Sequence, residues 1–159
     1  MEVVKSSFTD DIYKLLDESK TGFENIKGEE QEGWTTTYET SFCMINAYYC
    51  LIRDNILSNE YVAVFVTWQT EEDVKKQINQ LSGAVGSALD NDYYYCYNET
   101  LDGIEFTKGT DIGVEDKSII EVKSEKSGDK YNLVLILKEP ELIYWQIMQE
   151  VINCLRYEH

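Results

Sequence analysis

The sequence has very little of several residue types on which catalysis and nucleic-acid binding depend. It contains one histidine, His159, one proline, Pro140, and two arginines, Arg53 and Arg156. A serine or cysteine nucleophile that needs histidine as its base therefore has no credible partner, because His159 is the last residue. Nucleic-acid binding is also disfavoured, since it depends largely on basic side chains and 30 acidic residues outnumber 14 basic ones.

Membrane spans and common ligand-binding motifs are missing as well. No stretch approaches roughly 18 consecutive apolar residues. The first residues, MEVVKSSFTDDIYKLL, lack a basic end followed by an apolar run, so synthesis in the cytoplasm is expected. Neither of two common nucleotide-binding glycine motifs occurs, and the acidic clusters lack the spacing of a calcium-binding loop. The sequence therefore predicts no cofactor, no metal site and no enzymatic activity.

The four cysteines, Cys43, Cys50, Cys96 and Cys154, are widely and irregularly spaced. They form no C-x-x-C pair, and no histidine lies near any of them to complete a zinc site. Cysteines of cytoplasmic proteins are usually reduced, and free cysteine is often buried as a small apolar side chain. We therefore expect four free thiols.

The acidic residues give the chain a formal net charge of -16. Such a charge can simply keep a protein soluble. It can also attract a basic partner or imitate nucleic acid toward a protein that binds it. A third use is to line a surface past which nucleic acid slides without sticking.

The first half of the chain combines a helix, a loop and strands. Apolar side chains at helical spacing predict a helix over residues 3–19. Residues 20–34 are polar and contain glycines, so an acidic loop is expected there. Residues 35–57 fit both a strand and a helix, with a strand favoured at their beginning, whereas branched and aromatic residues at 61–68 predict a buried strand.

A second helix is predicted over residues 71–89, with Thr70 as its N-cap and three acidic residues in its first turn. Its apolar stripe is formed by Val74, Ile78, Leu81, Val85 and Ala88 or Leu89. Gly83 and Gly86 each destabilise a helix by about 1 kcal/mol relative to alanine. We expect them to allow close packing, either within the chain or between subunits.

The remaining sequence predicts strands and a last helix. The stretch DNDYYYCYNET is expected to be a strand with Tyr94 and Cys96 facing inward. A short strand at 103–107, a hairpin formed by SIIEVKS and YNLVLILKE, and a helix over 140–159 follow. The predicted class is α+β: one domain over residues 1–159, with two to four helices packed on a mostly antiparallel sheet.

One block resembles the tail-terminator (tail-completion) proteins of tailed bacteriophages. It consists of the strand YVAVFVTW, the helix TEEDVKKQINQLSGAVGSALDND and the later strand KYNLVLILKE, and it covers about residues 60–138 together with the N-terminal helix. The resemblance implies a non-enzymatic subunit of a hexameric ring that ends the tail tube of the virion and joins it to the head. Copies of the chain and neighbouring tail or connector proteins would be its partners. No functional residue carries over from the family.

A second hypothesis is a small acidic inhibitor in the cytoplasm. It would be an immunity protein against a basic toxin nuclease or a phage-encoded blocker of a nucleic-acid enzyme, because complementary charge speeds association with a basic protein. Tyrosine is enriched at protein interfaces, and exposed carboxylates would meet basic groups. Both hypotheses therefore share one set of candidate contact residues: Tyr93, Tyr95, Tyr97, Glu29, Glu30, Glu32, Asp111, Glu115 and Asp116.

Overall fold

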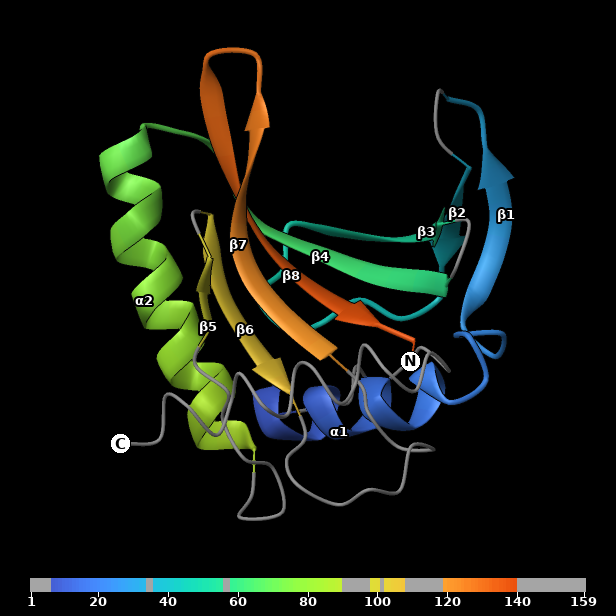
Figure 1. The fold of residues 1–159 in the computed structure, drawn as a ribbon. Helices are drawn as coiled ribbons and strands as arrows, with labels where there is room; N and C mark the ends of the chain where they lie inside the picture. The colour runs from blue at the N-terminus through green and yellow to red at the C-terminus, as the bar shows by residue number, and fades with distance from the viewer. Residues whose placement is uncertain are drawn as a thin grey trace.

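The computed structural model describes residues 7–33, 36–55, 58–89, 98–100, 102–107 and 119–139. Each of the two described helices precedes four strands (Figure 1). The elements are α1 (Phe8–Ser19), β1 (Lys27–Gln31), β2 (Thr37–Thr40), β3 (Tyr49–Asn55), β4 (Ser58–Gln69), α2 (Glu71–Ala88), β5 (Asn98–Thr100), β6 (Gly103–Thr107), β7 (Ile119–Ser127) and β8 (Lys130–Lys138).

The described strands form one antiparallel sheet of eight, in the order β1-β2-β3-β4-β8-β7-β6-β5. Each half is a meander of four neighbouring strands, and the pairing of β4 with β8 joins the two halves at the centre. That central pairing is regular from Glu60 opposite Lys138 to Val64 opposite Val134. The predicted α+β class with an antiparallel sheet is confirmed.

Both helices cover the same face of the sheet and enclose the main core. Apolar residues of α1, such as Ile12 and Leu15, and of α2, such as Val74 and Val85, belong to one buried cluster with side chains from five strands. Tyr61, at the centre of β4, is fully buried in this cluster. Burial of this apolar surface stabilises the layer of helices on the sheet.

The opposite face of the two central strands carries a second buried cluster, formed by Val62, Val64, Val134 and Ile136. Arg53 of β3 donates a 3.0 Å hydrogen bond to Glu125 of β7. Two strands lie between β3 and β7, and their pairing places Arg53 level with Ile119, so in a flat sheet Glu125 would lie about 14 Å across and about 20 Å along β7 from Arg53. The ion pair therefore requires a strongly coiled sheet, whose curvature is visible in Figure 1.

Two predicted boundaries in the first half are wrong. The first helix begins at Phe8 and not at residue 3, because Ser7 is extended and its hydroxyl accepts a 3.2 Å hydrogen bond from the Asp10 amide as the N-cap. The predicted loop 20–34 contains β1, which forms because its backbone pairs with β2. The ambiguous stretch 35–57 contains β2 and β3 and no described helix.

The second half agrees more closely with the sequence. Thr70 caps α2 as predicted, and β4, β6, β7 and β8 occupy the expected stretches. Close packing of Gly83 within the chain was wrong, because this glycine is exposed and a Cβ there would meet nothing within 4 Å, while packing of Gly83 between subunits stays a prediction. The predicted helix 140–159 and the inward Tyr94 and Cys96 lie outside the described residues.

Candidate protein-contact site

Three large aromatic side chains are exposed in the described part of the chain, and all three lie on β3, β4 or the loop before β3. Tyr48 and Trp68 are each 75% exposed, and Tyr49 is 42% exposed. The Tyr48 amide donates a 2.7 Å hydrogen bond to the carbonyl of Val64, and Tyr49 pairs with Val64 in the sheet. Trp68 follows Val64 by four residues, or about 13 Å of strand. We call Tyr48, Tyr49 and Trp68 the aromatic surface.

Trp68 has a strained backbone that packing does not explain. Three described residues other than glycine have positive φ: Phe23 at 63°, Asn46 at 67° and Trp68 at 62°. Phe23 is fully buried, so core packing offsets its strain, and asparagine tolerates this conformation better than most residues. Trp68 has neither compensation, since it is bulky and mostly exposed. Strain of this kind concentrates at functional sites.

The strain at Trp68 arises from the irregular end of β4. The pairing with β8 shifts by one residue between Val64 and Val66 and again between Val66 and Gln69. Each shift places an extra residue in β4, as a β-bulge does, and bulges redirect side chains. The Trp68 amide donates a 3.3 Å hydrogen bond to the side-chain oxygen of Asn132 on β8, which holds the irregular backbone in place.

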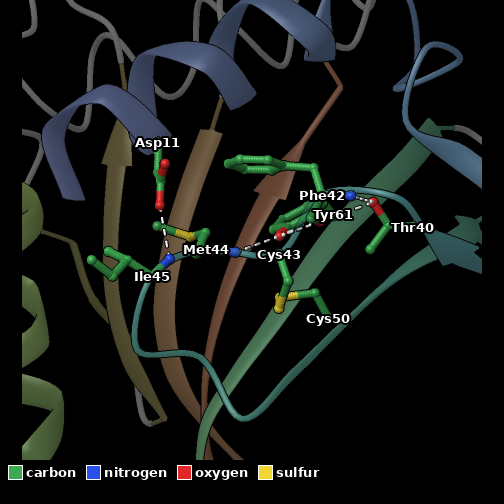
Figure 2. The surroundings of a disulfide bond; sticks show 8 residues. All are labelled: Asp11, Thr40, Phe42, Cys43, Met44, Ile45, Cys50 and Tyr61. Atoms are coloured by element: carbon green, nitrogen blue, oxygen red, sulfur yellow. Dashed lines mark hydrogen bonds between the residues drawn. A yellow bond between two sulfur atoms is a disulfide. The ribbon is translucent and has the colours of Figure 1, made fainter. Parts of the chain in front are cut away.

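The loop that leads to Tyr48 and Tyr49 is held from inside the protein (Figure 2). The carboxylate of Asp11, on α1, accepts a 2.8 Å hydrogen bond from the Ile45 amide. The hydroxyl of Tyr61, on β4, accepts from the Met44 amide at 3.2 Å and donates to the Phe42 carbonyl at 3.1 Å. Because Asp11 and Tyr61 are almost fully buried, the loop has a rigid foundation.

A disulfide between Cys43 and Cys50 closes this loop, with the two Cα atoms 5.4 Å apart (Figure 2). The expectation of free thiols was therefore wrong for this pair, while Cys96 and Cys154 lie outside the described residues. Residues 41–48 turn back, with Asn46 at φ 67°, and this turn brings the two cysteines together. The bridge fixes the segment that contains Tyr48, which lies directly before the start of β3 at Tyr49.

Acidic residues begin directly after the aromatic surface. Glu71, Glu72 and Asp73 form the exposed first turn of α2, three to five residues beyond Trp68.

Beneath the loop, burial raises the pKa of the Tyr61 hydroxyl, and the charge of Asp11 raises it further, although the hydrogen bond from Met44 acts in the opposite direction. Tyr61 therefore remains a neutral hydrogen-bonding group.

The predicted contact residues are not brought together with the aromatic surface. Glu29 and Glu30 are exposed on β1, at the edge of the sheet and two strands from β3, and Glu32 is exposed just beyond it. Charged side chains on an edge strand hinder pairing with another strand, so two copies of β1 would repel each other. The other candidates, Tyr93, Tyr95, Tyr97, Asp111, Glu115 and Asp116, lie outside the described residues.

The sequence reasoning missed all three residues of the aromatic surface. Tyr48 and Tyr49 lay in the ambiguous stretch 35–57, and Trp68 ended a strand predicted to be buried on both faces. One signal was present: Trp68 stands two residues before the Thr70 cap, where the strand has to end. Its exposure follows from the bulged end of β4, which periodicity does not reveal.

Comparisons of the chain with protein-family models, with curated proteins and with solved structures each found no match. Within the described residues, no group of three or more histidine, cysteine, aspartate or glutamate side chains is placed to hold a metal ion. Neither described helix is both long and apolar enough to cross a membrane.

Proposed function

We propose that this chain is a non-enzymatic protein that acts by binding other proteins through the aromatic surface. The observation that carries the proposal is Trp68, a 75% exposed tryptophan held at φ 62° on a bulged strand. A strained backbone that presents a large ring to solvent lowers stability without adding to the core. Tryptophan and tyrosine are enriched among the residues that dominate binding energy at protein interfaces.

The fixed loop adds to this proposal. Binding is tighter when the contact residues are already held in the bound conformation, because less conformational entropy is lost. The disulfide, the hydrogen bond from the Ile45 amide to Asp11 and the hydrogen bond from Tyr61 to the Phe42 carbonyl fix the loop before Tyr48. Such an arrangement suits a permanent or tight contact.

The form of assembly that we propose first is a ring, on the basis of the resemblance to tail-terminator proteins. In that form the aromatic surface contacts a neighbouring copy or the tail tube, and the acidic residues keep passing DNA from sticking. The charged edge of β1 makes this strand a poor contact between copies. The aromatic surface is therefore the better contact between copies.

Light scattering and negative-stain microscopy of the purified protein test this proposal. We expect rings of about six copies for the wild type and for Gln80→Ala, a control at an exposed position of α2. We expect Trp68→Ala to remain monomeric while keeping its fold. If the wild type assembles only on tail tubes, the same pair of variants is compared there. Equal assembly of Trp68→Ala and the wild type would contradict the proposal.

A second candidate is an inhibitor of a basic protein. The three acidic residues that follow Trp68 favour it, since carboxylates beside aromatic rings match lysine and arginine side chains. A strict monomer that binds a basic nuclease tightly, with association slowed by salt, would support the inhibitor over the ring. Trp68→Ala should then raise the rate of dissociation.

A further inference from the structure

A groove of about 290 Å³ lies between α2 and the strands β6, β7 and β8. Its apolar wall includes Val74 and Ile78 of α2, Ile104 of β6 and the ring of Tyr131 on β8. It lies near the end of β4 that carries Trp68, because Tyr131 pairs with Gln69, the residue after Trp68. Pockets for drug-sized ligands occupy about 300–1,000 Å³, so this groove lies at the lower end of that range and has room for one long side chain.

Among the described residues, the polar rim of the groove has one acidic side chain without a partner. Lys75 and Glu71 lie on the rim and pair with each other, with 3.5 Å between Nζ and Oε1. Asp102, at the start of β6, uses its backbone carbonyl to accept a hydrogen bond from Ser124. Its exposed carboxylate has no hydrogen bond or ion pair with any described residue. The groove therefore combines an apolar wall with an available negative charge.

Gly103, directly after Asp102, fixes this end of the groove. A Cβ at this position would overlap the backbone of β7, so close approach of the two strands requires glycine. β6 and β7 pair in register from Gly103 onward. The position of Asp102 thus depends on regular sheet structure and not on a long loop.

We propose that this groove binds a lysine or arginine side chain of a partner protein. The aliphatic stem would lie along Val74, Ile78 and Ile104, while the cationic head would meet Asp102 and the face of Tyr131. The net charge of -16 favours a basic partner in the same way. This inference rests on the proposed protein-binding function and names the chemistry that the partner presents near the end of β4 that carries Trp68.

The probe for this inference is butylguanidinium, an arginine side chain with a methyl group in place of its Cα. Titration of the ¹⁵N-labelled protein in about 150 mM salt screens long-range attraction. We expect amide shifts at Gly103, Ile104 and Ser124 with a Kd of about 1–10 mM, as the size of the probe allows. Pentanoate, which has a similar stem and a negative head, should cause no such shifts. Equal shifts with pentanoate, or none with butylguanidinium, would overturn the inference.

Two pairs of variants sharpen this test. Asp102→Asn should weaken binding about threefold, whereas Asp129→Asn, at an exposed acid outside the groove, should leave it unchanged. Lys75→Gln should strengthen binding about twofold because it removes a competing cation, whereas Lys76→Gln, the exposed neighbour, should have no effect. Equal effects within either pair would show that only net charge matters and would refute a specific site.

The two proposals can fail separately. If Trp68→Ala no longer binds a partner or no longer assembles into rings of subunits, while butylguanidinium causes no shifts, the groove inference is wrong and the contact function stands. If the probe binds while Trp68→Ala behaves as the wild type, the contact function through the aromatic surface is wrong.

Discussion

Replacing Trp68 separates its contribution to stability from its contribution to binding. Trp68→Ala removes the ring but keeps a side chain on a backbone with φ 62°. Trp68→Gly removes the ring and also allows the backbone to adopt this conformation without strain. Because the ring is 75% exposed, its removal should cost little buried surface in either variant.

The difference between the two variants measures the strain. A non-glycine residue in the left-handed conformation is destabilised by about 1–2 kcal/mol. Glycine loses about 0.5–1 kcal/mol more backbone entropy than alanine on folding. Trp68→Gly should therefore be more stable than Trp68→Ala by up to about 1.5 kcal/mol, and at least as stable as the wild type.

Urea unfolding of the three proteins measures these differences, and the assembly or partner-binding assay is run on the same samples. We expect Trp68→Gly to combine full stability with lost binding, which is the pattern of a residue kept for contact. A Trp68→Gly protein less stable than Trp68→Ala would refute the strain. A loss of more than about 2 kcal/mol in Trp68→Ala would show that the ring packs within the fold and would refute its contact role.

Three further predictions concern the loop beneath the aromatic surface. The Cys43–Cys50 bridge closes a loop of about eight residues, so its reduction or the double change to alanine should lower the free energy of unfolding by about 2.5 kcal/mol. Peptide mass mapping verifies the bridge, and unfolding with and without reductant measures the difference. Asp11→Ala leaves the Ile45 amide without its acceptor and should destabilise by about 1–3 kcal/mol, whereas Asp11→Asn keeps an acceptor and should lose less in the same unfolding assay. Because the pKa of Tyr61 is raised, the folded state keeps a proton that the unfolded chain loses above pH 10. The contribution of Tyr61 to stability is therefore present below pH 10 and falls by about 1.4 kcal/mol per pH unit above it. Tyr61→Phe should be less stable than the wild type at pH 7, and the difference should shrink between pH 10 and 11 in urea unfolding.

Much of the fold could be predicted because its local and tertiary preferences agree. The residues of β4 are branched or aromatic over most of their length, and α2 combines an apolar stripe with a threonine cap and acidic residues in its first turn. The hairpin β7–β8 has a turn at Gly128, whose φ of 67° suits glycine. Where the spacing of apolar residues in the sequence agrees with their burial in the structure, the predicted helices and strands were correct to within a few residues.

The errors occur where distant residues decide the structure. The segment KGEEQ has little tendency to form a strand, and β1 exists through its pairing with β2. The pairing of Cys43 with Cys50 depends on how residues 41–48 turn over Asp11 and Tyr61. Neither spacing nor composition contains this information, so the exposure of Tyr48 and Tyr49 could not be predicted from the sequence.

The position of the site in the fold explains how the protein tolerates its strain. The two halves are held together by regular pairing of β4 with β8 from residue 60 to residue 64, where both faces are buried. The bulges, Trp68 and the start of α2 come after this segment, at the connection from one half to the other. Strain at this connection therefore does not weaken the central pairs, and the core can hold an exposed tryptophan in an unfavourable conformation. A partner that contacts Trp68 and the groove would touch both halves at this connection, and would so stabilise their relative position without any change in the core.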